Sequence, residues 1–234
     1  VEYRVGGRKG EDRLVTARRE VIVSGGTINS PQLLQLSGIG PAEMLKTHGI
    51  EVQHDLPEVG RGLQDHLAVS HFFWATAPTL NASLGSRAGQ MAAGLRYVLT
   101  RRGPLSVPVN QCSGFARTEG AARPDVQIYC NPASYATLPN GKPQIDRDNG
   151  FLLCVQPSRP TSRGEITLRS ANPADAPRID PHYLERQADV ALLMRGIEMT
   201  RDIMGHAEVS HELTGELEPG PKFLDHQALR KELP

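Results

Sequence analysis

Small and polar residues that could contact an anionic cofactor gather in residues 24–31 of this 234-residue chain. Gly25 and Gly26 follow an apolar run there and precede a helix start at Ser30 and Pro31. Glycines allow a ligand to approach closely, and a helix N-terminus presents free N–H groups at the positive end of its dipole. The pattern is typical of a strand-turn-helix unit that contacts a cofactor, or else of an ordinary unit whose glycines only turn the chain.

Two other segments contain residue types that could carry chemistry. Asp65 and His66 could form an acid/base pair, because a carboxylate can orient an imidazole. Adjacent residues seldom face one site, so a structural turn is the favoured interpretation. The run Gly-Gly-Arg-Lys-Gly at residues 6–10 lacks the spacing and the Lys-Ser/Thr ending of a phosphate loop. We interpret it as a solvated turn.

The three cysteines, Cys112, Cys130 and Cys154, are widely spaced and odd in number, so they form no disulfide framework. We expect reduced thiols in or near the core; a reactive or metal-binding role is the alternative. His206, His211 and His226 show no helical metal spacing. No metal site is predicted, and a reducing cytoplasm is the expected location.

Charge and hydropathy exclude several classes of protein. The 26 basic and 26 acidic side chains cancel, so the net charge predicts neither nucleic acid nor an anionic membrane surface as a partner. No apolar run approaches the roughly 18 to 20 residues that span a bilayer. The sequence therefore predicts a soluble protein without a transmembrane segment.

The elements that must position residues 24–31 are predicted from hydrophobic pattern and turn chemistry. We expect a β-hairpin at the start of the chain, formed by residues 1–5 and 13–24. Residues 21–23 are all β-branched and apolar, which predicts a strand buried on both faces. The helix that begins at Ser30 and Pro31 should last only about two turns, because Gly38 suits its C-cap and Pro41 opens a second helix ending at Gly49.

The rest of the chain predicts a mixture of strands and helices. Strands are expected at 71–74, within 105–117, and at 125–129, 151–155 and 165–169; helices are expected at 88–102, at 188–205 and, briefly, from Asp225. The intervening segment 131–150 is a lid or a simple excursion. The fold class is therefore α/β with α+β character.

Two blocks resemble one family. Gly26-Thr27-Ile28-Asn29-Ser30-Pro31-Gln32-Leu33-Leu34-Gln35-Leu36-Ser37-Gly38-Ile39-Gly40 resembles the second signature of the glucose-methanol-choline (GMC) flavoprotein oxidoreductases. The Arg-Pro-x-Ser-Arg-Gly run at residues 159–164 and Pro-x-Ile-Asp-Pro-x-Tyr-Leu at residues 177–184 are similar to its carboxy-terminal domain. The arginines of the first run either bind an anion or, as we favour, brace the turn. Residues 59–66 also match a family segment, except that Gly62 stands where the family commonly has Asn.

The resemblance implies a fold, a cofactor and candidate site residues. Residues 1–70 would be part of an FAD-binding Rossmann-like domain, and residues 71–234 part of a substrate domain built on an antiparallel sheet with flanking helices. The residues implied to lie near FAD are Ser24, Gly25, Gly26, Asn29 and Ser30. Strands of the substrate domain line the alcohol pocket in this family, which makes Asn110 and Gln111 candidates to contact the substrate.

Two segments of the family pattern are absent from this sequence. Neither the Gly-x-Gly-x-x-Gly turn that holds the FAD pyrophosphate nor the His-Pro-x-Gly-Thr-like segment that supplies the catalytic base is found. We therefore expect an interior fragment of a longer enzyme, with no catalytic residue of its own, negligible turnover and weak or absent FAD binding when isolated.

The resemblance implies that the parent enzyme oxidises a primary alcohol, choline-like or other, to an aldehyde. A base takes the hydroxyl proton while the carbinol hydride passes to the flavin. The electron acceptor, the alcohol and the oligomeric state are left open. Two alternatives are a cyanohydrin lyase of the same fold and a non-catalytic α/β binding module.

Overall fold

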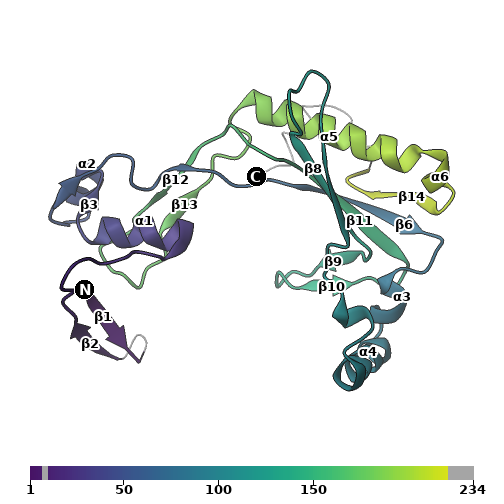
Figure 1. Ribbon diagram of the computed structural model, residues 1–234, viewed down its shortest axis with the longest axis horizontal. Coiled ribbons are helices and arrows are strands. Elements are labelled where there is room, and N and C mark those ends of the chain that lie inside the picture. The colour runs from purple at the N-terminus through teal and green to yellow at the C-terminus, as the bar shows by residue number, and fades with distance from the viewer. Residues whose placement is uncertain (7–9, 221–234) are drawn as a thin grey trace. The chain divides into compact units, whose positions relative to one another are not determined.

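The computed structural model describes residues 1–6 and 10–220, which pack into two compact units. Unit 1 consists of Val1–Asp65 and Ser162–Glu185, and unit 2 of His66–Thr161 together with the residues from Arg186 onward. The chain therefore leaves unit 1, builds most of unit 2, returns to unit 1 and crosses again (Figure 1). The predicted short helix from Asp225 lies outside the described residues.

Unit 1 is built from short strands and two helices. Its elements in chain order are β1 Glu2–Val5, β2 Glu11–Leu14, α1 Gly26–Leu36, β3 Ile39–Gly40, α2 Ala42–Thr47, β4 His54–Asp55, β5 Arg61–Leu63, β12 Gly164–Thr167 and β13 Arg178–Asp180. β1 and β2 form the predicted antiparallel hairpin, β3 and β4 pair in parallel, and β12 lies between β5 and β13 in an antiparallel sheet. The second sequence block thus supplies the central strand of the sheet on which α1 packs.

The prediction of a buried strand at residues 21–23 is wrong. The segment forms no regular element, and the side chains of Val21 and Ile22 are 55% and 78% exposed. A strand needs partners for its backbone N–H and C=O groups, and no described strand pairs with this segment. The side chains of Val21 and Ile22 therefore remain largely uncovered by the described residues.

The predicted start of the first helix is also wrong. α1 begins at Gly26, with Gly25 as its N-cap, so Pro31 lies inside an eleven-residue helix. An interior proline removes one helical hydrogen bond, yet the packing of α1 against β12 keeps the helix continuous. The predicted end is confirmed, because Gly38 follows the C-cap with a φ of +81°, and α2 follows Pro41 as expected.

Unit 2 is organised around a five-stranded antiparallel sheet. Its strands, in spatial order, are β14 Leu213–Glu218, β6 Val69–Ala75, β11 Gly150–Pro157, β8 Val126–Asn131 and β7 Cys112–Ala116. The sheet and the two predicted long helices confirm the expected mixed fold class. Within the segment 105–117, only β7 is a strand; it follows the short helix η2 Pro104–Ser106.

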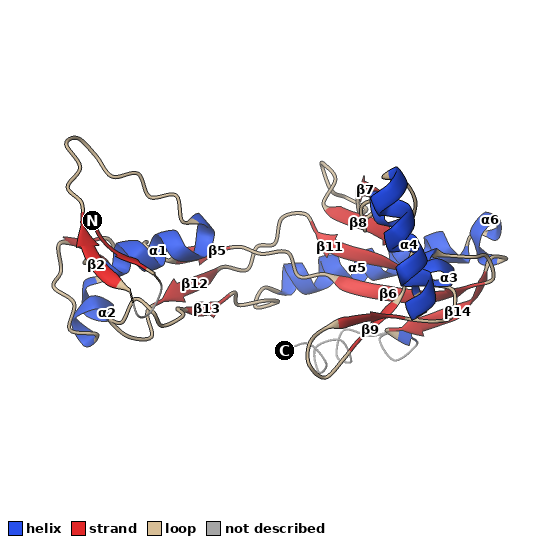
Figure 2. Ribbon diagram, turned by 90° about the horizontal axis from the view of Figure 1, so that it is seen from below, coloured by secondary structure: helices blue, strands red, loops and turns tan. Residues whose placement is uncertain are grey.

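Helices and a small hairpin surround this sheet (Figures 1 and 2). They are α3 Leu80–Leu84, α4 Arg87–Thr100, α5 Gln187–Gly205, α6 Ala207–Ser210 and the pair β9 Tyr135–Thr137 and β10 Pro143–Ile145. The β9–β10 hairpin occupies the predicted excursion at 131–150. Figure 1 shows α5 along one side of the sheet and α4 on the opposite side.

The core of unit 2 lies between α5 and the sheet. The predicted apolar stripe of the helix is confirmed: Val190, Leu193, Met194 and Ile197 are at most 3% exposed. At roughly 1.5–3 kcal/mol for each fully buried side chain, this stripe is the main stabilising contact between helix and sheet. By contrast, the prediction that all three cysteines are near the core fails for Cys112, which is exposed at the start of the edge strand β7.

Candidate functional site

The predicted cofactor residues lie together at the N-terminal end of α1. Ser24, Gly25, Gly26 and Asn29 are exposed, and Ser30 is half-buried. No side chain caps the helix, so its first-turn N–H groups are not used by a capping residue. Exposed donors at the positive end of a helix dipole suit a negatively charged or hydrogen-bond-accepting group.

Gly25 and Gly26 are favoured at their positions by different physical constraints. A Cβ on Gly25 would lie 3.1 Å from both the Asn29 Cβ and the Ser30 backbone N, so a side chain would crowd the first helical turn. Gly26 has a φ of +77°, which disfavours other residues, and a Cβ there would meet nothing within 4 Å. The space beside the helix start is therefore open, and these residues fit contact with a cofactor such as FAD.

Gln35 anchors α1 to the rest of unit 1. Its side chain is fully buried and its Nε2 donates to the carbonyl oxygens of Val59, at 3.1 Å, and Ile166, at 2.9 Å. A Cβ on Gly60 would lie 2.5 Å from this Nε2 and 2.2 Å from the Ile166 oxygen. Because Gly60 has no side chain, the Gln35 amide has space to bridge α1 and β12. This contact fixes the direction in which the N-terminus of α1 points.

The five-stranded sheet of unit 2 has two chemically different faces. On one face, Val126 and Val155 lie against α5, since a Cβ on Gly196 would be 3.3 Å from Val126 Cγ1 and 2.6 Å from Val155 Cγ2. Side chains alternate between the two faces of a strand, so the neighbouring Gln127 and Gln156 point to the opposite face. We call the part of the face away from α5 that carries Gln127 and Gln156 the polar face; the buried Leu152 lies farther along the same face.

A chain of polar contacts crosses this face from β7 to the start of unit 2. Gln127 Nε2 donates to Ser113 Oγ at 3.1 Å, and Gln156 Nε2 donates to Gln127 Oε1 at 2.9 Å. The same Gln156 nitrogen lies 3.1 Å from His66 Nδ1, while His66 Nε2 lies 3.2 Å from the carbonyl oxygen of Ser158. Both contacts of the ring fit the neutral tautomer with its proton on Nε2. Three strands and one imidazole thus present a connected set of donors and acceptors.

Tyr129 belongs to the same face, two residues along β8 from Gln127. Burial and a hydrogen bond with the Cys154 thiol raise the pKa of Tyr129 well above its ordinary value, so the phenol stays neutral. Cys154 Sγ also lies 3.3 Å from Ser70 Oγ. This part of the face offers the neutral phenol of Tyr129 beside a hydroxyl and a thiol group.

The sequence did not single out Gln127, Tyr129 or Gln156 as site residues. The available signal was the strict alternation of Val126, Gln127, Ile128 and Tyr129, which separates a polar face from an apolar one. The pairing register that places β7, β8 and β11 side by side could not be predicted from the sequence.

Asn110 and Gln111 lie just before β7 and are exposed; neither is part of a strand. The backbone N–H of Gln111 donates to the Cys130 carbonyl at 2.9 Å, and its side chain donates to the Pro108 carbonyl. The structure thus places the two predicted substrate residues at the edge of the sheet, ahead of the strand that carries Ser113.

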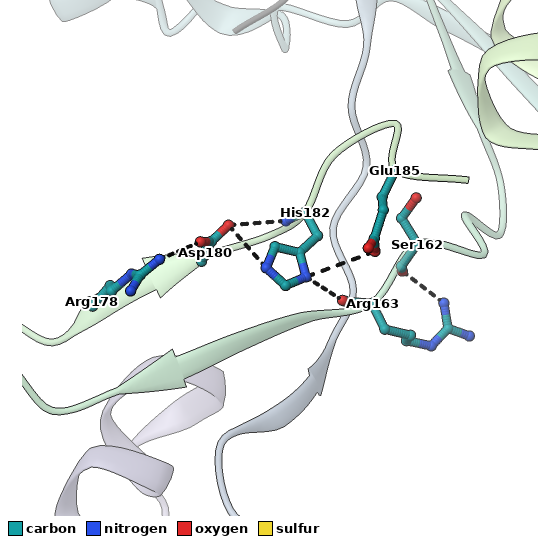
Figure 3. Close-up of polar contacts among 6 residues, drawn as sticks. All are labelled: Ser162, Arg163, Arg178, Asp180, His182 and Glu185. Atoms are coloured by element: carbon teal, nitrogen blue, oxygen red, sulfur yellow. Dashed lines mark hydrogen bonds and ion pairs between the residues drawn. The ribbon is translucent and has the colours of Figure 1, made fainter. Parts of the chain in front are cut away.

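A separate polar cluster braces unit 1 where the chain turns after β13 (Figure 3). His182 has a φ of +51°; its Nδ1 lies 3.0 Å from the Arg163 carbonyl oxygen and its Nε2 lies 3.5 Å from Asp180 Oδ1. Arg178 Nη2 donates to Asp180 at 2.9 Å and lowers the pKa of that carboxyl. These contacts hold a strained turn in place, which indicates a structural role.

Asp65 and His66 have different hydrogen-bond partners in the structure. The Tyr183 hydroxyl donates to the Asp65 carboxylate, and this hydrogen bond raises the pKa of Tyr183 to about 12. Gly62, which stands where the family has Asn, has a φ of +73°. Because Gly and Asn are the residues that adopt this conformation most readily, either residue fits the backbone at this point of β5.

The arginines of the Arg-Pro-x-Ser-Arg-Gly run contact backbone carbonyls. Arg159 Nη1 donates to Pro124 at 3.1 Å and Arg163 Nη1 donates to Ser162 at 2.9 Å. Both contacts fit the bracing role. Within the described ranges, no group of three or more His, Cys, Asp or Glu residues is placed to hold a metal ion, and no helix is long and apolar enough to cross a membrane.

Comparison with known proteins assigns these features to one family. Two models described as GMC oxidoreductase match residues 1–68 and 160–232, together more than half of the chain. The chain is 38% identical over 204 residues to the alcohol dehydrogenase [acceptor] of Pseudomonas putida, covering 86% of this chain and 36% of that protein. It is 38% identical over 207 residues to the oxygen-dependent choline dehydrogenase of Brucella anthropi, covering 88% and 37% of the two chains.

A solved structure has the same fold. The formate oxidase of Aspergillus oryzae RIB40, a protein whose FAD is modified, superposes with a TM-score of 0.82 at 24% identity, covering 95% of this chain and 44% of that one. This chain spans little more than a third of the length of the alcohol dehydrogenase and the choline dehydrogenase described above. The matching blocks, the fold and the shared identity show that the chain belongs to the GMC oxidoreductase family.

Proposed function

We propose that the protein containing this chain is an FAD-dependent oxidoreductase that acts on CH–OH groups and oxidises a primary alcohol to an aldehyde. The names of the two curated relatives and the open helix start at Gly25 and Gly26 support this function. The observation that carries it is the hydrogen-bonded polar face of the sheet in unit 2, formed by Ser113, Gln127 and Gln156.

The start of α1 would contact the cofactor. Four of the candidate residues are exposed and one is half-buried, and the first turn adds backbone donors; the five are Ser24, Gly25, Gly26, Asn29 and, half-buried, Ser30. Gln35 keeps the helix in position. When bound, FAD accepts the hydride that leaves the alcohol carbon. Residues 1–70 would accordingly belong to the flavin domain and residues 71–234 to the substrate domain, an assignment that stays a proposal.

The polar face would bind and orient the alcohol. Gln127 and Gln156 hold one another in fixed rotamers, and amides fixed in this way can hydrogen-bond a hydroxyl group without reorganising. Tyr129, kept neutral by its surroundings, adds a phenol to the same face. Asn110 and Gln111, at the sheet edge, would contact the part of the substrate away from the reacting carbon.

The role of the polar face predicts the kinetics of one variant. In the intact protein, Gln127→Leu removes both the bond to Ser113 and the acceptor for Gln156 while keeping a similar volume. We expect kcat/KM for the alcohol to fall by about 10- to 100-fold, the effect of losing one or two positioning hydrogen bonds of roughly 1.4–2.7 kcal/mol in total.

The matched control is Gln144→Leu, an exposed glutamine on β10, which should leave kcat/KM unchanged. Unchanged kinetics in folded Gln127→Leu protein would exclude the proposed role of this face. Cyanohydrin cleavage by the wild-type protein without dye reduction would instead identify a lyase. Tight binding of another ligand, with FAD excluded, would identify a binding module.

A further inference from the structure

Helix α4 packs against unit 2 with its small residues and directs its large apolar residues outward. Ala93, 6% exposed, is its buried residue. Met91, Leu95, Val98 and Leu99 are 76%, 62%, 66% and 73% exposed. At 3.6 residues per turn these four side chains share one stripe, roughly opposite Ala93. This arrangement is the reverse of an ordinary surface helix, whose apolar stripe faces the core.

The helix itself is well formed. Ser86 Oγ caps its N-terminus by accepting from the Gly89 N–H at 3.1 Å. Gln90 Nε2 donates to the Leu84 carbonyl at 2.8 Å, which attaches the first turn to α3. At the other end, Arg101 has left-handed backbone angles and closes the helix. The exposed apolar stripe therefore belongs to a capped and anchored helix.

Positive charge surrounds this stripe, although the chain as a whole is neutral. Residues 66–118 contain no Asp, Glu or Lys and hold five arginines: Arg87, Arg96, Arg101, Arg102 and Arg117. The four arginines on or next to α4 are exposed, and none takes part in an ion pair within the part of the chain that the structure describes. Arg101 lies over the ring of Tyr97, with Cζ 5.4 Å from the centroid.

We propose that α4 is an interfacial docking helix for an anionic lipid bilayer. An amphipathic helix with an apolar face flanked by arginines lies in the plane of the membrane interface, with its apolar side chains inserted and its cations near lipid phosphates. Leu105 on η2, which packs against α4, is a further exposed apolar side chain, at 47%.

The positive charge of the α4 surface argues against a second copy of this chain as its binding partner. In a two-fold dimer the same surface meets itself, so the arginines of one α4 would approach those of the other, and residues 66–118 supply no carboxylate to pair with them. An anionic bilayer satisfies both features of the surface, because phosphates pair with the arginines and acyl chains cover the apolar stripe. α4 lies on the side of the sheet opposite α5, so the docked surface would not involve the core helix (Figure 1).

The test is vesicle co-sedimentation of the intact protein that contains this chain. We expect it to bind vesicles of phosphatidylcholine mixed with phosphatidylglycerol and to bind pure phosphatidylcholine at least 10-fold more weakly. The variant Leu95→Ser with Val98→Ser should lower the partition coefficient at least 10-fold. Arg96→Gln with Arg101→Gln should lower it about as much and reduce its dependence on salt.

The controls are Ile203→Ser, an exposed apolar residue on α5, and Arg123→Gln, an exposed arginine outside α4; both should bind like the wild type. Circular dichroism and thermal unfolding establish that each variant is folded. Absence of vesicle binding, or binding that the α4 variants do not alter, would overturn the proposal. If the wild-type protein is a dimer and the serine variant is a monomer, the α4 surface binds a second copy and the membrane proposal is overturned.

Discussion

The most unusual single residue in the core is His71. It is fully buried on β6, and neither ring nitrogen has a hydrogen-bond partner among the described residues. Burial lowers its pKa to about 4; the Glu216 carboxylate opposes this shift and the Arg201 guanidinium adds to it. The imidazole therefore stays neutral in the folded protein at a pH where an exposed histidine would be protonated.

This lowered pKa predicts a specific acid sensitivity. Between pH 6.5 and 4 the unfolded chain binds a proton that folded His71 does not, so the free energy of unfolding should decrease as the pH falls. The total loss attributable to His71 by pH 4 is about 3 kcal/mol. Urea denaturation at successive pH values should show that His71→Leu has a flatter dependence over this range.

The matched control is His211→Gln, because His211 is exposed. It should retain the acid sensitivity of the wild type. An equal pH dependence in His71→Leu and the wild type would contradict the assignment of this loss to His71.

At the scale of elements, the register of strands and the close approach of α5 to the sheet determine where the polar face lies. Gly196 sits where the helix comes closest, since a Cβ there would overlap Val155 Cγ2 at 2.6 Å. The helix is thus held at a distance that only a residue without a side chain permits.

We expect Gly196→Ala to be destabilising, although alanine favours helices by about 1 kcal/mol over glycine. Overpacking against Val155 costs roughly 1–3 kcal/mol, so a net loss of about 1 kcal/mol should appear in urea denaturation. Gly94→Ala in α4 is the control, because a Cβ there meets nothing within 4 Å and should stabilise the protein. Stabilisation of both variants would show that α5 does not approach the sheet this closely.

The two long helices and the strands β6, β8, β11 and β12 were predictable because their signals are local, whereas β14 was not predicted. The alternation in β12 and the apolar stripe of α5 follow from side-chain period alone. The start of α1 was not predictable, because Gln35, buried against β12 across more than a hundred residues of sequence, stabilises a helix that contains Pro31. The strand predicted at residues 21–23 failed for a related reason, since its partners are not among the described strands.

At the scale of the whole molecule, each unit combines segments that are distant in sequence. Tyr183 meets Asp65 within unit 1, and Thr161 donates to Asp189 within unit 2 from its N–H at 2.7 Å and its Oγ1 at 2.8 Å. The residues near the start of α1 that are proposed to contact FAD come from the family resemblance and stay a prediction. The polar face of unit 2 was not predictable, because it depends on strand register between three separate segments.

The distribution of functional segments predicts the behaviour of the 234-residue chain alone. It contains the residues at the start of α1 that are proposed to contact FAD but no Gly-x-Gly-x-x-Gly turn to hold the pyrophosphate. We expect the purified chain to lose FAD on gel filtration and to show no alcohol-dependent dye reduction. Stoichiometric FAD that stays bound through gel filtration would contradict this expectation.

The most direct measurement is anaerobic titration of the intact protein with primary alcohols, choline among them, while the flavin absorbance is recorded. The proposed function predicts that an alcohol bleaches the oxidised flavin spectrum with formation of one equivalent of aldehyde. Gln127→Leu should bleach far more slowly than Gln144→Leu. A flavin that stays oxidised with every primary alcohol, in protein that dithionite reduces normally, would contradict the account.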